Sequence, residues 1–143
     1  MHGFVTVLLL ALTTYGTTNI KLPTGKVVKV ELAMTADELA KGMSGLKSVP
    51  EEGMLLVYKA PTRTSYHLMA YPGPVDIAYL DENKKIINLK RNAAPCALGV
   101  PNCGHDSVWL HIYALQLPPG SLERLNLHAG DTLSFEVPET PPF

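Results

Sequence analysis

Proline and glycine punctuate this chain from end to end, and this punctuation favours short elements of secondary structure. The 143 residues include twelve prolines and eleven glycines. Proline fixes φ and removes a backbone donor, and both residues favour turns, so the pattern favours β architecture over long helices. Apolar residues make up 46% of the chain, which is enough for a globular core, and the length suits one domain. We therefore expect a mainly β, compact single domain, either a small barrel or a sandwich.

Hydrophobic patterning places the strands. Residues 27–33 alternate between apolar and charged side chains, which is typical of a half-buried strand. The run MLLVY at 54–58 is continuously apolar and predicts a central strand. Residues 75–80 and 85–90 flank a polar turn and predict a hairpin. Further strands are expected at 65–69, 108–117 and 132–137.

Two short helices are expected, at about 36–43 and 121–125. Thr35 and Glu38 have the spacing of a capping box, in which each side chain bonds the backbone N–H of the other residue. Ser121 follows a Pro-Pro-Gly turn and is expected to cap the second helix. Both helices are short enough to pack on a single sheet.

An apolar run at residues 4–12 allows two interpretations of the N-terminus. Its length suits the hydrophobic region of a signal peptide, and it is shorter than the ~20 residues that a membrane-spanning helix needs. The preceding residues lack Lys and Arg, and no A-x-A cleavage pattern follows. The alternative is an apolar strand that pairs with the sheet edge of a neighbouring subunit. Residues 1–19 are therefore expected to be a signal peptide or an N-terminal strand, and residues 20–143 the β-rich domain.

The charge balance and the absence of common motifs narrow the classes of function. The formal net charge is −1, so no broad positive field exists to attract nucleic acid. The sequence contains no P-loop, no dinucleotide-binding glycine motif and no nucleophile elbow. No catalytic constellation stands out, so enzymatic activity is left open.

Cys96 and Cys103 are the only cysteines, and they lie in one long loop expected at 92–107. In an oxidising compartment they would close a small disulfide ring. In the cytosol they would be free thiols or metal ligands. The export-like N-terminus favours the disulfide.

Three histidines, His67, His105 and His111, are candidate metal ligands. In a small barrel the imidazoles of His67 and His111 could face each other, and with His105 or Asp76 they would make a three-ligand site that leaves one coordination position open. His105 and His111 also match a zinc site together with the two cysteines, but the C-x6-C spacing is wider than in common zinc modules. The sequence therefore allows a divalent metal, zinc or copper. The other interpretation is that these are ordinary interior or surface histidines.

Asp76 is a further candidate for ligand binding. It opens a strand that is otherwise apolar, so an inward-pointing carboxylate must be hydrogen-bonded or paired. A structural role is the alternative, in which Asp76 ties the proline loop or pairs with Arg63 or Arg91.

Aromatic residues complete the set of candidate binding residues. Tyr66, Tyr71 and Trp109 could form a ligand surface, because sugar-binding faces use such rings. Aromatic rings equally fill the core of a β domain, so their presence alone does not identify a site.

Five motifs follow one another along the chain. They are TADELAKGM at 35–43, PEEGMLLVY at 50–58, PVDIAYLD at 74–81, the pair Pro95-Cys96, and LPPGSLERLNLHAGD at 117–131.

In this order, between residues 27 and 137, the motifs resemble the DUF192 family of small prokaryotic proteins of unknown function. The resemblance implies a compact β-rich fold that is often exported, and it supplies no reaction. Asp76 matches the family's Asp. Many members carry an F-W-M-x-N-T-like segment, whereas residues 66–71 read YHLMAY, with His67 in place of Trp and without the Asn and Thr.

Three functions follow from these observations. The first is an exported accessory or binding domain, periplasmic or extracellular, whose partner is a small molecule, a glycan or a protein. The second is a small metal-binding protein or metalloenzyme that uses His67, His105 and His111. The third is a structural subunit that self-assembles through residues 4–12.

Overall fold

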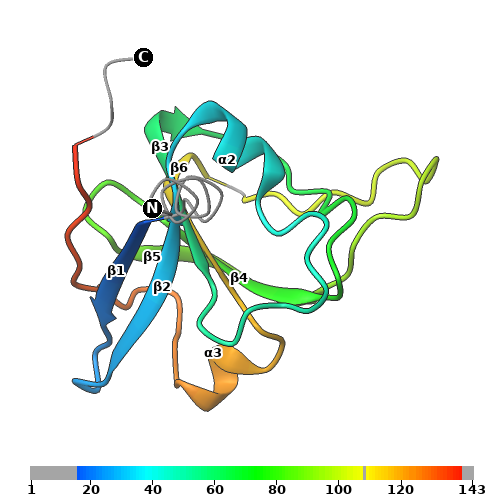
Figure 1. The fold of residues 1–143 in the computed structure, drawn as a ribbon. Coiled ribbons are helices and arrows are strands. Elements are labelled where there is room, and N and C mark those ends of the chain that lie inside the picture. The colour runs from blue at the N-terminus through cyan, green and yellow to red at the C-terminus, as the bar shows by residue number, and fades with distance from the viewer. Residues whose placement is uncertain (1–15, 108, 140–143) are drawn as a thin grey trace, which may run out of the picture.

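A six-stranded sheet is the main element of the computed structural model, which describes residues 16–107 and 109–139 (Figure 1). Two short helices, α2 (Ala36–Lys41) and α3 (Ser121–Arg124), accompany it, so the prediction of a mainly β single domain with two short helices is confirmed. The expectations for residues 4–12 lie outside the described residues. No helix in the described part of the chain is long and apolar enough to cross a membrane. The strands are β1 (Gly16–Lys21), β2 (Val27–Ala33), β3 (Met54–Thr62), β4 (Val75–Leu80), β5 (Ile86–Ala93) and β6 (His111–Leu117).

The sheet has the order β1-β2-β3-β6-β4-β5. Only β2 and β3 run parallel, and α2 lies in the crossover that joins them. The predicted hairpin is confirmed as β4 and β5, joined by a turn at 81–85.

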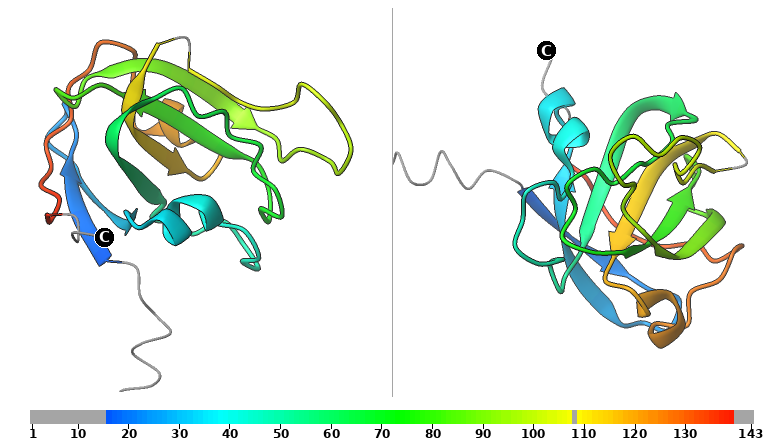
Figure 2. Two further views of the ribbon diagram at one scale, coloured as in Figure 1. Left: turned by 90° about the horizontal axis from the view of Figure 1, so that it is seen from above. Right: turned by 90° about the vertical axis from the view of Figure 1, so that its right-hand side faces the viewer.

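The two edge strands, β1 and β5, do not pair with each other, but the segment at 132–134 bonds to both edges of the sheet. Ser134 exchanges backbone hydrogen bonds of 2.8 and 3.1 Å with Lys21, the last residue of β1, and the Leu133 N–H donates to the carbonyl of Lys84, just before β5, at 2.9 Å. The predicted strand at 132–137 was therefore wrong, because this segment forms isolated bridges to both edges instead of a continuous ladder. The sheet curls without closing into a barrel, and the fold is sandwich-like (Figure 2).

Side chains from the two faces of the sheet form two hydrophobic clusters. Along β3, Leu55 and Val57 belong to one cluster and Met54 and Leu56 to the other, because successive strand side chains alternate. We call the first the α3-side cluster, since it includes Leu122 of α3. We call the second the α2-side cluster; it is completed by residues that follow α2 or lie between β3 and β4, among them Met43, Tyr66 and Leu68.

The helix α2 begins as predicted and ends early. Thr35 and Glu38 form the expected capping box, with a Glu38 N–H to Thr35 Oγ1 distance of 3.1 Å. The helix ends at Lys41 rather than 43, because Gly42 adopts a φ of 50°. The hydroxyl of Tyr71 occupies the space where a Cβ at Gly42 would lie. This close approach brings residues 64–71 against the end of α2.

Two other expected strands differ from the structure. Residues 65–69 were predicted as a strand, but Leu68 and Ala70 have φ values of 56° and 58°. Left-handed backbone at these positions breaks an extended run, so only Tyr66 makes an isolated bridge, to His105. The strand predicted at 108–117 begins at His111.

Asp76 is the only charged side chain on β4, and it is 1% exposed. Its two carboxylate oxygens accept from the backbone N–H groups of Asn92, at 2.8 Å, and Leu122, at 3.0 Å. Asp76 therefore ties β4 to α3 and to Asn92, and the expectation that Ser121 caps α3 was wrong, because Gly120 is the N-cap and Ser121 is the first helical residue. Among the described residues no ion pair joins Asp76 to Arg91.

We predict that Asp76→Ala lowers the free energy of unfolding by about 2–4 kcal/mol, because the buried N–H of Leu122 and the partly buried N–H of Asn92 lose their acceptors. Asp76→Asn should cost less, since one amide oxygen remains. Urea unfolding followed by circular dichroism measures both values. Asp81→Ala is the matched control, because Asp81 Oδ1 also accepts from two backbone N–H groups, but in an accessible turn. Equal losses for Asp76→Ala and Asp81→Ala would contradict the assignment.

Candidate functional site

A pocket of about 230 Å³ opens on the α2 side of the sheet, between α2, β3 and residues 64–71. The Ser44 hydroxyl donates to the Met69 carbonyl at 2.6 Å, and the Gly45 N–H donates to the Ala70 carbonyl at 2.9 Å. These bonds fix one wall against the turn after α2. None of the described residues that line the pocket is Asp, Glu, Lys or Arg. Its hydroxyl-bearing residues are Ser44, Tyr58, Thr64, Ser65, Tyr66 and Tyr71.

Three side chains form a hydrogen-bonded chain that runs from the interior to this pocket. His111, at the start of β6, is fully buried, and its Nε2 lies 2.8 Å from the Tyr66 hydroxyl. The Tyr66 hydroxyl donates in turn to the hydroxyl of Tyr58, on β3, at 2.9 Å. The His111 ring also packs against Tyr79, with ring centroids 5.1 Å apart. Aromatic rings therefore enclose the imidazole.

Burial keeps this chain of groups uncharged. Desolvation lowers the pKa of His111 from 6.5 to about 4, so the imidazole is neutral at pH 7. Desolvation also raises the pKa of Tyr66 well above the usual range, and the neighbouring Tyr58 raises it further. The pKa of Tyr58 is raised by burial as well. The site therefore offers neutral hydrogen-bonding groups rather than charges.

Tyr71 and Gln116 form a second polar contact at the pocket. The Tyr71 hydroxyl donates to Oε1 of Gln116, on β6, at 2.6 Å. Gln116 is fully buried, and its Nε2 is one of two buried side-chain atoms in the described part of the chain that lack a hydrogen-bond partner. The other is Nδ1 of His111. His111 bonds to Tyr66 and Gln116 bonds to Tyr71, and both tyrosines line the pocket. The two unsatisfied polar atoms therefore belong to side chains directly beneath the pocket lining.

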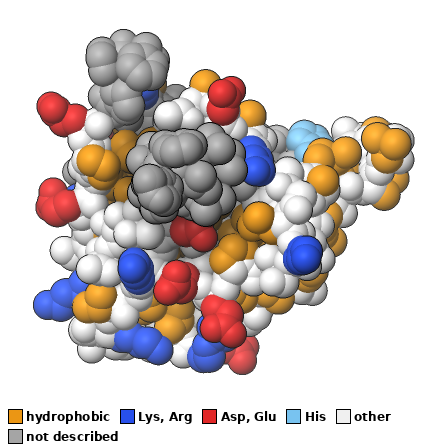
Figure 3. Space-filling view, viewed as in Figure 1, with side chains coloured by type: hydrophobic (Ala, Val, Ile, Leu, Met, Phe, Trp, Pro, Cys, Tyr) orange, Lys and Arg blue, Asp and Glu red, His pale blue; other side chains and the backbone are white. Residues whose placement is uncertain are grey.

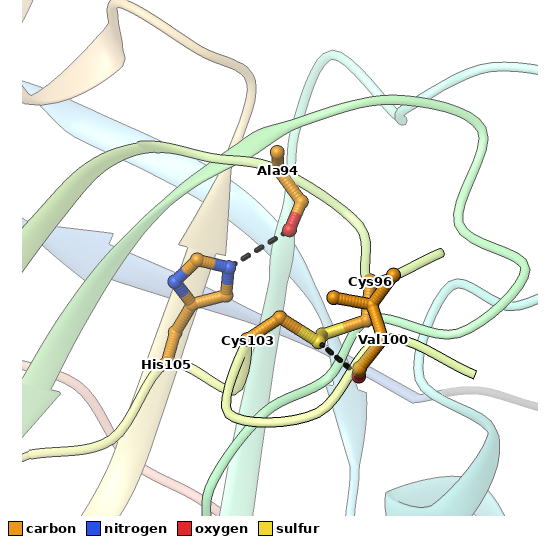
Figure 4. The surroundings of a disulfide bond; sticks show 5 residues. All are labelled: Ala94, Cys96, Val100, Cys103 and His105. Carbon is orange, nitrogen blue, oxygen red and sulfur yellow. Dashed lines mark hydrogen bonds between the residues drawn. A yellow bond between two sulfur atoms is a disulfide. The ribbon is translucent and has the colours of Figure 1, made fainter. Parts of the chain in front are cut away.

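The predicted disulfide between Cys96 and Cys103 is present, with Cα atoms 5.7 Å apart (Figure 4). The loop that it closes projects from the domain, and hydrophobic side chains gather at its tip (Figures 1 and 3). Leu98, in this loop, is 90% exposed.

Both ends of the disulfide loop bond to the wall of the pocket. The Cys96 N–H donates to the carbonyl of His67 at 2.8 Å, and Tyr66 and His105 exchange backbone bonds of 3.0 and 2.8 Å. The Tyr79 hydroxyl donates to the His105 carbonyl at 2.8 Å. Residues 66–67 are therefore held in place by the loop that the disulfide closes.

The structure separates the four residues expected to bind a ligand. Tyr66 and Tyr71 line the pocket, and their role in ligand binding stays a prediction. Trp109 is 63% exposed and does not line the pocket, and Asp76 is buried beside α3. Tyr58 and Gln116 were not among the residues predicted from the sequence. Tyr58 ends the apolar run at 54–58 and belongs to no recognisable site motif.

The three candidate metal ligands have different surroundings. His67 is exposed, His105 Nε2 lies 2.8 Å from the carbonyl oxygen of Ala94 (Figure 4), and His111 bonds to Tyr66. Within residues 16–107 and 109–139 no group of three or more His, Cys, Asp or Glu side chains is placed to hold a metal. A zinc or copper site stays a prediction.

Fold and site together define a class of protein, namely small mainly β domains with a neutral, hydroxyl-lined pocket braced by a disulfide loop. A family model matches residues 19–135. The chain belongs to the DUF192 family, described as "Uncharacterized ACR", which confirms the resemblance of the motifs.

The chain is similar to a curated protein in sequence and to two solved structures in fold. A UPF0127 protein of Thermococcus sibiricus is 31% identical over 108 residues, which cover 73% of this chain and 66% of that protein, slightly under two thirds of its length. A crystal structure from Sinorhizobium meliloti 1021, described as a "putative transcription regulator", matches with a TM-score of 0.75 at 22% identity, over 85% of this chain and 95% of that one. A protein of unknown function from Novosphingobium aromaticivorans matches with a TM-score of 0.71 at 22% identity, over 84% of each chain. These two structural likenesses concern the fold alone.

We predict that His111 makes the protein less stable in mild acid. Between pH 6.5 and about 4 the unfolded chain binds a proton at this residue while the folded protein does not. The free energy of unfolding should therefore fall as the pH is lowered through this window, by up to about 3 kcal/mol from this residue. Urea unfolding of the wild type and His111→Gln at pH 7 and pH 4.5 (about the two ends of the window) measures it.

The variant should show a smaller pH dependence than the wild type, because glutamine does not titrate. His128→Gln is the control, since the His128 side chain is 61% exposed. The assignment fails if His111→Gln and His128→Gln change the pH dependence equally.

We also predict that removing the disulfide loosens the wall of the pocket. Cys96→Ser/Cys103→Ser should lower the free energy of unfolding, because the unfolded chain loses a cross-link. The loss should be only about 2 kcal/mol, since the loop that the disulfide closes is short. Amide hydrogen exchange should accelerate at Tyr66, Cys96 and His105, beyond the global change seen at Leu125 in the α3 turn. A uniform change at all four amides would show that the loop does not brace the pocket.

Proposed function

We propose that this chain is an exported binding domain whose α2-side pocket takes a small polar molecule. The observation that carries the proposal is the lining of the pocket, in which six hydroxyl-bearing side chains surround a space of about 230 Å³. A pocket of this size suits one sugar ring or a molecule of similar size better than a long chain. Aliphatic residues such as Leu39, Leu56 and Leu68 supply the apolar part of the lining.

The protonation states favour binding over catalysis. Tyr58 and Tyr66 hold their protons tightly, and His111 is neutral well below pH 7. Such groups form directed hydrogen bonds and do not exchange protons readily near neutral pH. A binding or accessory role is therefore a better match to this pocket than general acid–base chemistry.

Export is supported by two features. The disulfide between Cys96 and Cys103 is of a kind that persists mainly in oxidising compartments such as the periplasm. The apolar run at residues 4–12 has the length of the hydrophobic region of a signal peptide.

A ligand screen by NMR tests the binding function. We expect members of a panel of small sugars, amides, carboxylic acids and amines to shift the amide signals of residues that line the pocket, such as Ser65, Leu68 and Met69. Ala40→Trp, which adds bulk at the pocket, should abolish these shifts. Ala36→Trp is the matched control, because Ala36 is exposed on the same helix and does not line the pocket. No shifts with any compound, or shifts elsewhere that persist in Ala40→Trp, would refute the proposal.

A further inference from the structure

The orientation of the buried chain of hydroxyls can be derived from His111. Its Nε2 lies 2.8 Å from the Tyr66 hydroxyl, whereas its Nδ1 is buried and has no partner among the described residues. A buried N–H without an acceptor is rarer in proteins than a buried acceptor without a donor. The ring therefore carries its hydrogen on Nε2 and donates it to the Tyr66 oxygen.

This donation directs the hydroxyl protons toward the pocket. Because the Tyr66 oxygen accepts from His111, its own proton goes to the Tyr58 oxygen, 2.9 Å away. The Thr64 hydroxyl lies 2.8 Å from the hydroxyl of Thr62. A phenol oxygen that accepts from a neighbouring hydroxyl keeps its own proton to offer to a further acceptor.

Tyr58 therefore faces the pocket as a donor. The described lining residues carry no carboxylate, ammonium or guanidinium group, and His67 is their one imidazole. A cationic ligand would lose hydration in this pocket without gaining an opposite charge, and an anionic ligand would meet only the His67 side chain.

On the basis of the binding function proposed above, we infer that Tyr58 is the specificity-determining residue of the pocket and selects neutral ligands through an oxygen acceptor. Sugars and amides share this chemistry, through hydroxyl or carbonyl oxygens. Tyr66 and His111 are positioning residues, since they act on the ligand through Tyr58. The inference deepens the proposed function by naming a ligand class and the atom that recognises it.

One experiment needs no ligand. A long-range ¹H–¹⁵N spectrum of the full-length protein reports which imidazole nitrogen of His111 is protonated. We expect the Nε2–H form in the wild type, and a loss of its exclusive population in Tyr66→Phe, where the acceptor oxygen is absent. An Nδ1–H form in the wild type would reverse the chain of donors and overturn the inference.

A matched ligand series tests the selection itself. Glucose and N-acetylglucosamine are neutral, whereas glucosamine is a cation and glucuronate an anion on the same type of ring. We expect the neutral pair to bind at least about tenfold more tightly than the charged pair in NMR titrations, and Tyr58→Phe to weaken the neutral pair about tenfold. The two neutral sugars separate hydroxyl recognition from carbonyl recognition.

Tyr113→Phe is the control, because Tyr113 packs on the α3-side cluster away from the pocket. Tighter binding of a charged sugar, no binding by any of the four, or unchanged binding in Tyr58→Phe would each overturn the inference. The proposed binding function would still stand if other compounds of the panel shift the pocket residues and Ala40→Trp removes those shifts. The binding function is refuted only by the NMR panel described above, so its failure can be told apart from a failure of the inference about Tyr58.

Discussion

The strand β4 is buried at all six positions, and this constraint organises both halves of the molecule. A strand covered on both faces requires a layer on each side, which the α3 turn and the α2-side segments provide. The only two side chains of β4 that carry polar groups each reach one layer. Asp76 bonds the backbone of α3 through Leu122, and Tyr79 bonds the backbone of the disulfide loop through His105. The strand therefore fixes the two layers through directed bonds as well as through apolar contact.

The pocket also depends on β4, indirectly, through the side chain of Tyr79. The Tyr79 ring packs against His111, and the loop segment that Tyr79 anchors pairs with Tyr66. Burying Nδ1 of His111 and Nε2 of Gln116 without a hydrogen-bond partner lowers the free energy of unfolding by about 1–3 kcal/mol for each atom. Apolar side chains at these positions would avoid that cost. Buried polar groups that are incompletely satisfied are concentrated at functional sites in proteins, which is consistent with a binding role for this pocket.

Local pattern was enough to predict the strands of the hairpin and the capping box of α2, since alternation, turn residues and caps act within a few positions. It failed at residues 65–69, where Leu68 and Ala70 adopt left-handed backbone under tertiary contacts with the end of α2. The site was harder to predict from the sequence than the strands and helices. His111 and Tyr66 are 45 positions apart, and Tyr58 is the last residue of an apolar run, so no periodicity records that their hydroxyl and imidazole groups meet. The sequence suggested Tyr66 and Tyr71 as aromatic rings of a ligand surface. The hydrogen bonds of their hydroxyl groups could not be predicted, because the partners come from distant parts of the chain.

A segment that departs from the DUF192-like motifs also lines the pocket. Residues 66–71 read YHLMAY where many members resemble F-W-M-x-N-T. Tyr66 adds a hydroxyl where the pattern has a phenylalanine, and that hydroxyl links His111 to Tyr58. Tyr71 replaces a small hydroxyl residue with a long one that reaches Gln116 on β6. These residues lie on a loop outside the strands, but Tyr66 and Leu68 belong to the α2-side cluster and Tyr71 packs against it, so the loop shapes one face of the core as well as the pocket. In this chain the sheet therefore fixes where the pocket lies, and the loop at 66–71 supplies the hydroxyl groups of Tyr66 and Tyr71 to its lining.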